Sequence, residues 1–203
     1  MVKCRQCRNV FHIIGDALNA QLDTTVMLKM AARSIVEEFN LKACHFRLLS
    51  RDLLTLDHVA AYGLSEAFLN KGPVDAERSV AEALQGNAVM VLDSVTDPRV
   101  QYPEAFKSEG IASMLTVPLQ TRGQVIGVLD VQSTEPEAFT QEDITVLQTL
   151  ADQLAIALNN SELLAETQEH LSQLRLLYHI TTSAASGTTL EEALFSAVKG
   201  LQV

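Results

Sequence analysis

The fold of this chain is decided by one stretch, Ala112-Ser-Met-Leu-Thr-Val-Pro-Leu-Gln-Thr-Arg-Gly-Gln-Val-Ile-Gly-Val-Leu-Asp-Val-Gln132. It contains two runs rich in apolar and β-branched residues, Ala112–Gln120 and Gln124–Gln132, which are typical of strands. Only Thr121-Arg122-Gly123 separates them. Because a connection this short joins antiparallel neighbours, the stretch predicts a β-hairpin.

A second hairpin is predicted upstream of the first. In Ala43–Leu49, apolar residues alternate with His45 and Arg47, as in a strand with one face buried. A turn follows at Ser50-Arg51-Asp52, and Leu54–Tyr62 returns as the second arm. Ala88–Leu92 adds a short strand, so the sequence predicts five strands.

Helical patterns lie on either side of these strands. Asp23 is a suitable N-cap for a helix that runs to about Phe39. Its predicted buried face consists of Val26, Met27, Met30, Ala31, Ile35 and Phe39. Shorter helices are predicted over Asn9–Ala20 and Ser79–Gln85, with one helical turn near Glu104–Lys107.

The longest predicted helix begins at Thr140. From Ile144 to Ile180 no Pro or Gly interrupts it, and a helix of about 35 residues is longer than one small domain can cover. Its second half must therefore pack on something else. A parallel partner helix in a homodimer is the simplest candidate, although the heptad pattern is imperfect. The side chains expected at that contact are Leu154, Leu158, Leu164, Leu171 and Leu174.

The end of the chain repeats features of its beginning. Phe11-His12-Ile13 is echoed by Tyr178-His179-Ile180, and Leu22-Asp23 by Leu190-Glu191 at nearly the same spacing. A pattern that recurs after one full domain indicates a tandem array. We therefore expect residues 178–203 to be the truncated start of a second repeat.

Composition limits the possible partners. The 203 residues carry 15 Lys and Arg against 25 Asp and Glu, a net charge of −10, which disfavours nucleic acid and anionic membranes. No apolar run approaches the ~18 residues of a membrane span, and no signal peptide is evident. The three cysteines suit a cytoplasmic protein. Cys4 and Cys7 lack a second pair for zinc, so no structural metal is expected.

Four blocks in a fixed order carry a family resemblance: Val89-Met-Val-Leu-Asp-Ser-Val-Thr-Asp-Pro-Arg99, Gly110-Ile-Ala-Ser-Met-Leu-Thr-Val-Pro-Leu119, Gly123-Gln-Val-Ile-Gly-Val-Leu-Asp-Val-Gln-Ser133 and Phe139-Thr-Gln-Glu-Asp143. Together they closely resemble a GAF domain, over about residues 22–160. The resemblance implies an α+β fold in α/β/α layers. A central antiparallel sheet of five or six strands would carry helices on both faces and a long C-terminal helix.

The resemblance also implies a domain organisation and a role. Residues 1–21 would form a helical lead-in, 22–160 the GAF domain, 161–177 a signalling helix and 178–203 the second repeat. GAF domains are sensory and dimerisation modules of signalling proteins. Their ligands range from cyclic nucleotides and bilins to haem, iron and metabolites, so the fold alone does not identify a ligand.

Particular ligand classes can be tested on the residues. Ser133-Thr134 stands where cyclic-nucleotide-binding members carry Asn-Lys, and Gln101-Tyr102 stands where bilin-binding members carry Cys-His. Free methionine-sulfoxide reductases need a reactive thiolate and a resolving cysteine at the pocket. All three cysteines here precede residue 45. We therefore expect no enzymatic activity and leave the cofactor unknown.

By resemblance, the segment from Leu64 to Gly110 caps the ligand pocket. Arg99 would meet an anionic group and Tyr102 would stack on a planar one. The candidate binding residues are Asp97, Arg99, Tyr102, Ser113, Thr116 and Asp130. As an alternative, Asp93 and Asp97 only form side-chain turns before Pro98.

Polar residues on the strands allow two interpretations each. Asp130 interrupts an apolar strand and either orients a ligand or lies at the strand's wet end, bonded to a helix terminus; the second is favoured. His45 and His58 lie on the two arms of one hairpin. They either face each other to bind a metal or haem iron, or are satisfied polar residues on a partly exposed face, and again the second is favoured.

These observations predict a cytoplasmic sensor of a multi-domain signalling protein. It would form a homodimer and bind an unknown small molecule, but neither nucleic acid nor membrane. A ligand-free dimerisation and spacing module is the main alternative, and a free methionine-R-sulfoxide reductase is a more remote one.

Overall fold

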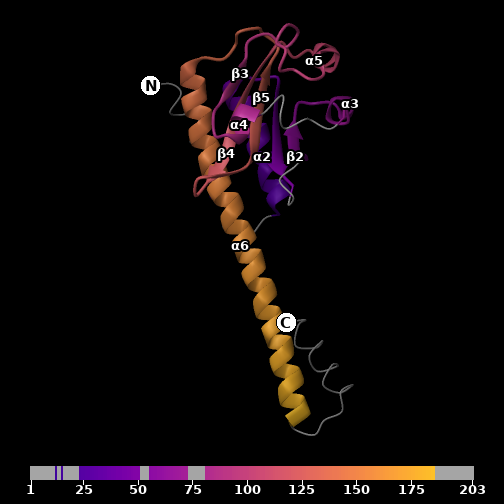
Figure 1. The fold of residues 1–203 in the computed structure, drawn as a ribbon, viewed down its shortest axis with the longest axis vertical. Helices are drawn as coiled ribbons and strands as arrows, with labels where there is room; N and C mark the ends of the chain where they lie inside the picture. Colours follow the sequence, from indigo (N-terminus) through magenta and orange to yellow (C-terminus); the bar gives the residue numbers. More distant parts are fainter. Residues whose placement is uncertain (1–11, 13–14, 16–22, 51–54, 73–80, 186–203) are drawn as a thin grey trace. The chain divides into compact units, whose positions relative to one another are not determined.

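A computed structural model of the chain describes residues 12, 15, 23–50, 55–72 and 81–185. Its centre is a five-stranded sheet with strand order β2-β1-β5-β4-β3, in which every neighbouring pair is antiparallel. The strands are β1 (Ala43–Leu49), β2 (Leu56–Tyr62), β3 (Val89–Val91), β4 (Ser113–Thr121) and β5 (Gln124–Ser133). The sheet and the helices on both of its faces confirm the predicted α+β fold (Figure 1).

The hairpin predicted from the deciding stretch is formed by β4 and β5. Val117 pairs with Leu129, and the register ends at Thr121 opposite Gln124. The turn residues Arg122 and Gly123 have φ angles of 50° and 79°. Positive φ at both central residues characterises the tight turn whose twist matches that of the flanking strands.

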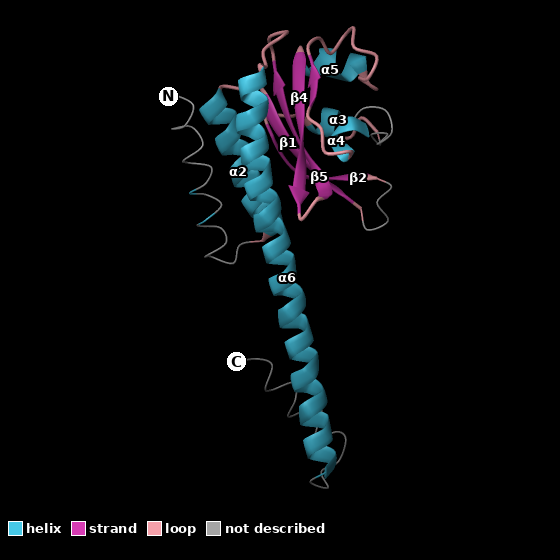
Figure 2. Cartoon of the chain, turned by 60° about the vertical axis from the view of Figure 1, so that its left-hand side comes forward, coloured by secondary structure: helices cyan, strands magenta, loops and turns pink. Residues whose placement is uncertain are grey.

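One face of the sheet is covered by α2 (Thr24–Phe39) and the beginning of α6 (Gln141–Ala185), as Figure 2 shows. The predicted cap is confirmed, because the Asp23 carboxylate accepts a hydrogen bond from the Thr25 amide. Val26 and Met30, however, are 44% and 42% exposed, so their predicted burial is wrong. The buried face of α2 instead includes Leu28, Ala32 and Val36. It is therefore rotated about the helix axis relative to the predicted face.

The other face of the sheet is covered by three short helices. They are α3 (Glu66–Leu69), α4 (Ala81–Leu84) and α5 (Pro103–Glu109). The sequence patterns predicted α4 and one turn of α5, but not α3. Phe68 of α3 and Phe106 of α5 pack edge to face, with ring centroids 5.2 Å apart. This contact joins two segments that cover the same face of the sheet.

Helix α6 is 45 residues long and uninterrupted, which confirms the predicted long helix. The chain divides into two compact units at Asn159–Asn160. In the first unit, Leu154 and Leu158 are 0% and 6% exposed in the core beneath the sheet. Both side chains are therefore packed within this chain, and the dimer contact proposed below uses only the other three predicted residues.

The second unit contains the rest of α6. Most of its large apolar side chains are exposed, including the three remaining predicted dimer residues Leu164, Leu171 and Leu174. The helix continues past the predicted boundary at residue 178 as far as Ala185. Residues 186–203 lie outside the described part, so the second repeat stays a prediction, as does the helix over 9–20 apart from residues 12 and 15. No helix among the described residues combines the length and apolarity that crossing a membrane requires.

Candidate ligand site

A cavity lies between the sheet and the segments that cover its second face. Its volume is about 40 Å³, which is room for a few water molecules or a small ligand. Strands β1, β4 and β5 form the floor, and α3, β3, the loop before α5 and α5 itself form the walls. The lining residues are His45, Arg47, Phe68, Lys71, Val91, Arg99, Val100, Gln101, Tyr102, Phe106, Met114, Asp130 and Gln132.

The floor contains a buried ion pair. Arg47 donates from Nε and Nη2 to Oδ2 of Asp130, both at 2.8 Å. Thr116 of β4 donates its hydroxyl hydrogen to the other carboxylate oxygen at 2.7 Å. The side chains of Arg47 and Asp130 are only 7% and 2% exposed. Three neighbouring strands are thus linked by charge-assisted hydrogen bonds that occupy both oxygens of the carboxylate.

This arrangement decides between the two interpretations of Asp130. Its partners are side chains on adjacent strands, so the favoured interpretation, a wet strand end bonded to a helix terminus, is wrong. Asp130 lines the cavity, yet its oxygens already accept from Arg47 and Thr116. It therefore holds Arg47 in place and leaves the polar contact with a ligand to other residues.

His45 and His58 contact each other at the edge of the cavity. Nε2 of His45 lies 2.8 Å from Nδ1 of His58, so one nitrogen donates and the other accepts. Burial, helped by the charge of Arg47, lowers the pKa of His45 well below its ordinary value, and burial also lowers the pKa of His58. The pair is therefore uncharged at neutral pH. His45 is only 5% exposed, so its predicted place on a partly exposed face is wrong.

Gln132 brings an unsatisfied polar group to the floor. The side chain is 1% exposed, and its Oε1 has no hydrogen-bond partner among the described residues. A buried amide oxygen without a donor costs about 1–3 kcal/mol relative to its hydration in water. Gln132 lines the cavity, so this acceptor belongs to a residue of the cavity floor.

Lys71 is the cation of the cavity that has no carboxylate partner among the described residues. Its ammonium group donates to the Phe68 carbonyl at 3.2 Å and lies 3.8 Å from the centre of the Phe68 ring. The pKa of Lys71 is lowered from 10.5 to about 8, mainly because the group is buried and also because Arg47 repels its charge. At neutral pH the ammonium is charged and only partly solvated.

Arg99, by contrast, has two carboxylates beside it. It donates from Nη2 to Asp97 at 2.6 Å and to the Met90 carbonyl at 2.8 Å, and its Nη1 lies 3.7 Å from Glu82. Asp97 also accepts from the Arg99 amide at 2.9 Å. The loop is therefore tied to β3, and the Arg99 guanidinium is held by protein carboxylates.

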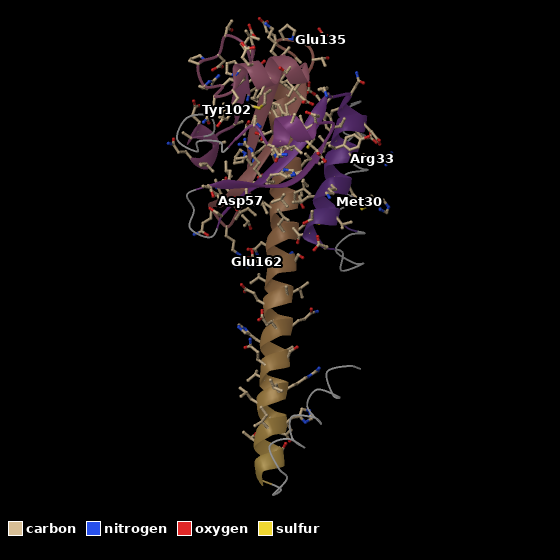
Figure 3. The ribbon with its side chains drawn as sticks, turned by 90° about the vertical axis from the view of Figure 1, so that its right-hand side faces the viewer. Met30, Arg33, Asp57, Tyr102, Glu135 and Glu162 are labelled. Atoms are coloured by element: carbon tan, nitrogen blue, oxygen red, sulfur yellow. The ribbon has the colours of Figure 1, made fainter. Side chains whose placement is uncertain are left out.

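Tyr102 completes the wall opposite the floor. Figure 3 shows it on the side of the sheet away from Met30 and Arg33 of α2. Gly72, at φ 122°, approaches it so closely that a Cβ there would lie 2.8 Å from the Tyr102 hydroxyl. Only glycine fits this approach, both for its backbone angle and for the space. The segment that carries Lys71 is thereby packed against the loop that carries Tyr102.

Of the six predicted binding residues, three line the cavity: Arg99, Tyr102 and Asp130. Asp97 and Thr116 do not line it but hold Arg99 and Asp130 through the hydrogen bonds above. Ser113 donates to the Glu135 carbonyl at 2.7 Å and does not line the cavity. The side-chain turns proposed for Asp93 are also present, because its carboxylate accepts from the Val95 amide and the Thr96 hydroxyl.

Sequence reasoning missed His45, Arg47, Lys71 and Gln132 as cavity residues. For three of them a signal was present. His45 and Arg47 alternate with apolar residues on β1, and Gln132 follows Asp130 at the same two-residue spacing on β5. Two neighbouring strands thus each carry a polar row, and the pairing of His45 with Asp130 aligns these rows on one face.

Cysteine and metal chemistry have little support in the described part of the chain. Cys44 lies in the apolar cluster on the opposite face of the sheet, and burial raises the pKa of its thiol well above the ordinary value. Cys44, the cysteine that the structure describes, is not among the residues that line the cavity. Among the described residues, no group of three or more His, Cys, Asp or Glu side chains is placed to hold a metal ion.

Comparison with known proteins gives a consistent result. A family model described as a GAF domain matches residues 21–159. The formate hydrogenlyase transcriptional activator of Salmonella typhimurium is 27% identical over 184 residues, which cover 86% of this chain and 26% of that protein. The chain thus spans about a quarter of the length of the curated relatives it matches.

Solved structures share the fold. The GAF domain of a phosphoenolpyruvate-protein phosphotransferase from Coxiella burnetii aligns with a TM-score of 0.66 at 19% identity, covering 78% of this chain and 95% of that one. The free methionine-R-sulfoxide reductase from Neisseria meningitidis aligns with a TM-score of 0.63 at 24% identity, covering 75% and 86%. The GAF domain of a phosphotransferase and a free methionine-R-sulfoxide reductase therefore share this architecture.

Proposed function

The chain belongs to the GAF domain family, and on that premise we propose that it is the ligand-sensing module of a larger signalling protein. In this proposal a small molecule binds in the cavity between the sheet and the segment from Leu64 to Gly110. The relation to a transcriptional activator supports a regulatory role. The output domain would belong to the protein of which this chain forms a part.

One observation carries the binding half of the proposal: the cavity keeps polar groups that the protein does not satisfy. Gln132 has an oxygen without a donor, and Lys71 has no ion-pair partner among the described residues. A pocket with only a structural role would be more stable if apolar side chains filled it. The cost of these groups is recovered when a ligand supplies their partners.

A route from the cavity to the helices supports the sensory half. Adjacent residues of β5 point to opposite faces. Asp130 and Gln132 face the cavity, whereas Leu129 and Val131 pack in the core that also contains Leu150 of α6. A ligand that binds one arrangement of β5 more tightly than another would therefore also bias the packing of α6.

The proposal includes a homodimer through the second part of α6, with a second copy of this helix as the partner. Leu164, Leu171 and Tyr178 recur every seven residues and are 56%, 51% and 68% exposed. Leu174 is 62% exposed and lies three residues after Leu171. This spacing is typical of helices that pair in coiled coils.

Two other functions remain as competing hypotheses. A purely structural dimerisation module would bind nothing in the cavity. A sulfoxide reductase would need a thiolate at the bound substrate, and the one described cysteine, Cys44, lies on the far face of the sheet. We therefore propose a sensor without turnover.

The binding half is tested by thermal-shift screening and calorimetry of the full chain against a library of organic acids, amino acids, nucleotides and heterocycles. We expect at least one compound to raise the melting temperature. Val100→Phe, which narrows the cavity, should reduce that shift. If no compound raises the melting temperature of either the parent or the variant, the structural module is the better hypothesis. Consumption of methionine sulfoxide would favour the enzyme.

The dimer half is tested separately by light scattering. The triple variant Leu164→Ser, Leu171→Ser and Leu174→Ser should convert a dimer to a monomer. The control Ile156→Ser changes an exposed apolar residue of the first unit (45% exposed) and should leave the mass unchanged. A monomeric parent chain, or a dimer that survives the triple change, would contradict this arrangement.

A further inference from the structure

The cations that line the cavity differ in how far the protein already neutralises them. Arg47 is paired with Asp130 at 2.8 Å, and Arg99 with Asp97 at 2.6 Å. Within the described part of the chain, the ammonium group of Lys71 contacts the carbonyl and the ring of Phe68 and no carboxylate. Among the described residues, one positive charge therefore has no ion-pair partner, and it lies in a partly desolvated place where a counter-charge is worth more than in water.

The unsatisfied acceptor sets a second requirement. Oε1 of Gln132 is buried and has no donor among the described residues. The hydrogens of Arg47 and Thr116 that could reach the floor are directed at Asp130. A ligand that satisfies Gln132 must therefore carry an O–H or N–H group.

Size and the remaining walls set a third requirement. The volume of about 40 Å³ favours a small ligand over a nucleotide or a tetrapyrrole. A dianionic phosphate would place two charges against the single free ammonium group. The rest of the wall is apolar, formed by Phe68, Val91, Val100, Phe106 and Met114. A short carbon chain with one negative charge fits these conditions.

We propose that the cavity binds a short carboxylate that carries a hydroxyl or amino donor next to the carboxylate, that is, a small 2-hydroxy or 2-amino acid. Its carboxylate faces Lys71, its donor reaches Oε1 of Gln132, and its alkyl group contacts the apolar wall. This inference rests on the proposed function, because it names the class of ligand for the same cavity.

Matched ligands test the two polar contacts one at a time. Lactate, propionate and lactamide have similar shapes, but propionate lacks the donor and lactamide lacks the charge. Calorimetry on the full chain should show lactate binding about tenfold more tightly than propionate, since one hydrogen bond to a buried unsatisfied group is worth about that factor. Lactamide should bind at least tenfold more weakly than lactate.

Variants assign these differences to residues. Gln132→Leu should remove the preference for lactate over propionate and keep the preference for lactate over lactamide. Lys71→Met should remove the preference for lactate over lactamide. Lys107→Met, which removes an exposed lysine of α5, is the matched control and should change neither. Circular dichroism establishes that each variant is folded.

The outcomes separate this inference from the proposed function. Equal binding of lactate and propionate, or a preference for lactate that survives Gln132→Leu, overturns the assignment of Gln132. Equal binding of lactamide overturns the assignment of Lys71. If none of these acids binds while another library compound does, the ligand class is wrong and the sensor stands. If nothing binds at all, both fail.

Discussion

The two faces of the sheet are built from the same strands and differ in almost every physical respect. On β5, Leu129 and Val131 face α2 and α6 in a closed apolar core, while Asp130 and Gln132 face the cavity. The apolar face is stabilised by burial of hydrophobic surface, at about 25 cal/mol per Å². The polar face carries a buried ion pair and an acceptor without a donor.

The difference shows which face stabilises the folded domain and which face lowers its stability. A buried ion pair is seldom more stable than apolar side chains of the same volume. An unsatisfied amide oxygen is a net loss. Changes on the two faces should therefore have opposite consequences, and the following variants test this contrast.

The largest effect is expected from Asp130→Ala. It leaves the Arg47 guanidinium buried without its counter-charge, which should lower the free energy of unfolding by about 3–5 kcal/mol. Urea unfolding measures this loss. In the double variant Arg47→Met with Asp130→Leu, both charges are gone, and most of the stability should return. A single variant as stable as the parent would show that the pair is not buried in solution.

The apolar face is tested by Leu150→Ala in α6. Leu150 is 0% exposed, and a cavity in its place should cost about 3 kcal/mol, within the 2–5 kcal/mol seen for such changes. The same substitution at the exposed Leu174 is the control and should stay within about 0.5 kcal/mol in folding stability. Equal losses at the two positions in urea unfolding would refute the division into a buried and an exposed part of α6.

Gln132→Leu should act in the opposite direction. It removes the oxygen that has no donor and should raise the free energy of unfolding by about 1–2 kcal/mol in the absence of ligand. Gln124→Leu, at the exposed start of β5, is the matched control, for which we expect a change of no more than about 0.5 kcal/mol. A destabilised Gln132→Leu would mean that this side chain already has its partners.

The smallest effect concerns Lys71 and depends on pH. Burial, followed by repulsion from Arg47 on β1, lowers its pKa to about 8 in the folded state, while the carboxylates of Asp130 on β5 and Glu109 on α5 oppose this shift. The unfolded chain keeps its proton up to about pH 10.4, the ordinary value for lysine. Between these pH values the unfolded state binds more protons, so stability rises with pH.

Lys71→Met removes the free-energy cost of burying the charged ammonium group. The variant should be more stable than the parent at pH 7 by about 1 kcal/mol, a value that allows for the screening of a partly exposed group. The difference should disappear by pH 10.5. Urea unfolding at both pH values measures it. A variant less stable at pH 7 would show that the contact between the ammonium and the Phe68 ring outweighs the cost of burial.

Much of the fold could be predicted because its signals are local. The β4–β5 hairpin follows from two apolar runs around a tight turn, and the cap at Asp23 follows from one side chain. The five strands and the long helix were confirmed in the same way. Helix α3 was missed because its four residues, Glu66–Leu69, are too few to show a period.

The site was less predictable because it is assembled from distant residues. Arg99 and Tyr102 could be assigned to the cavity from the loop that carries them. The sequence did not show that Arg99, expected to bind an anionic ligand, already forms an ion pair with Asp97. Lys71 has no local pattern that sets it apart from a surface lysine. The packing of Phe68 against Phe106 and of Gly72 against Tyr102 brings that segment over the cavity.

The network of Arg47, Asp130 and Thr116 has a consequence for the entropy of recognition. Its hydrogen bonds already fix the strongest charges of the site before any ligand arrives. The head of Lys71 is likewise held at Phe68. Binding therefore has few side chains to immobilise, and immobilisation is a main cost of association. The affinity of such a preorganised site is governed by the free energy that it costs to remove water from the ligand as it enters.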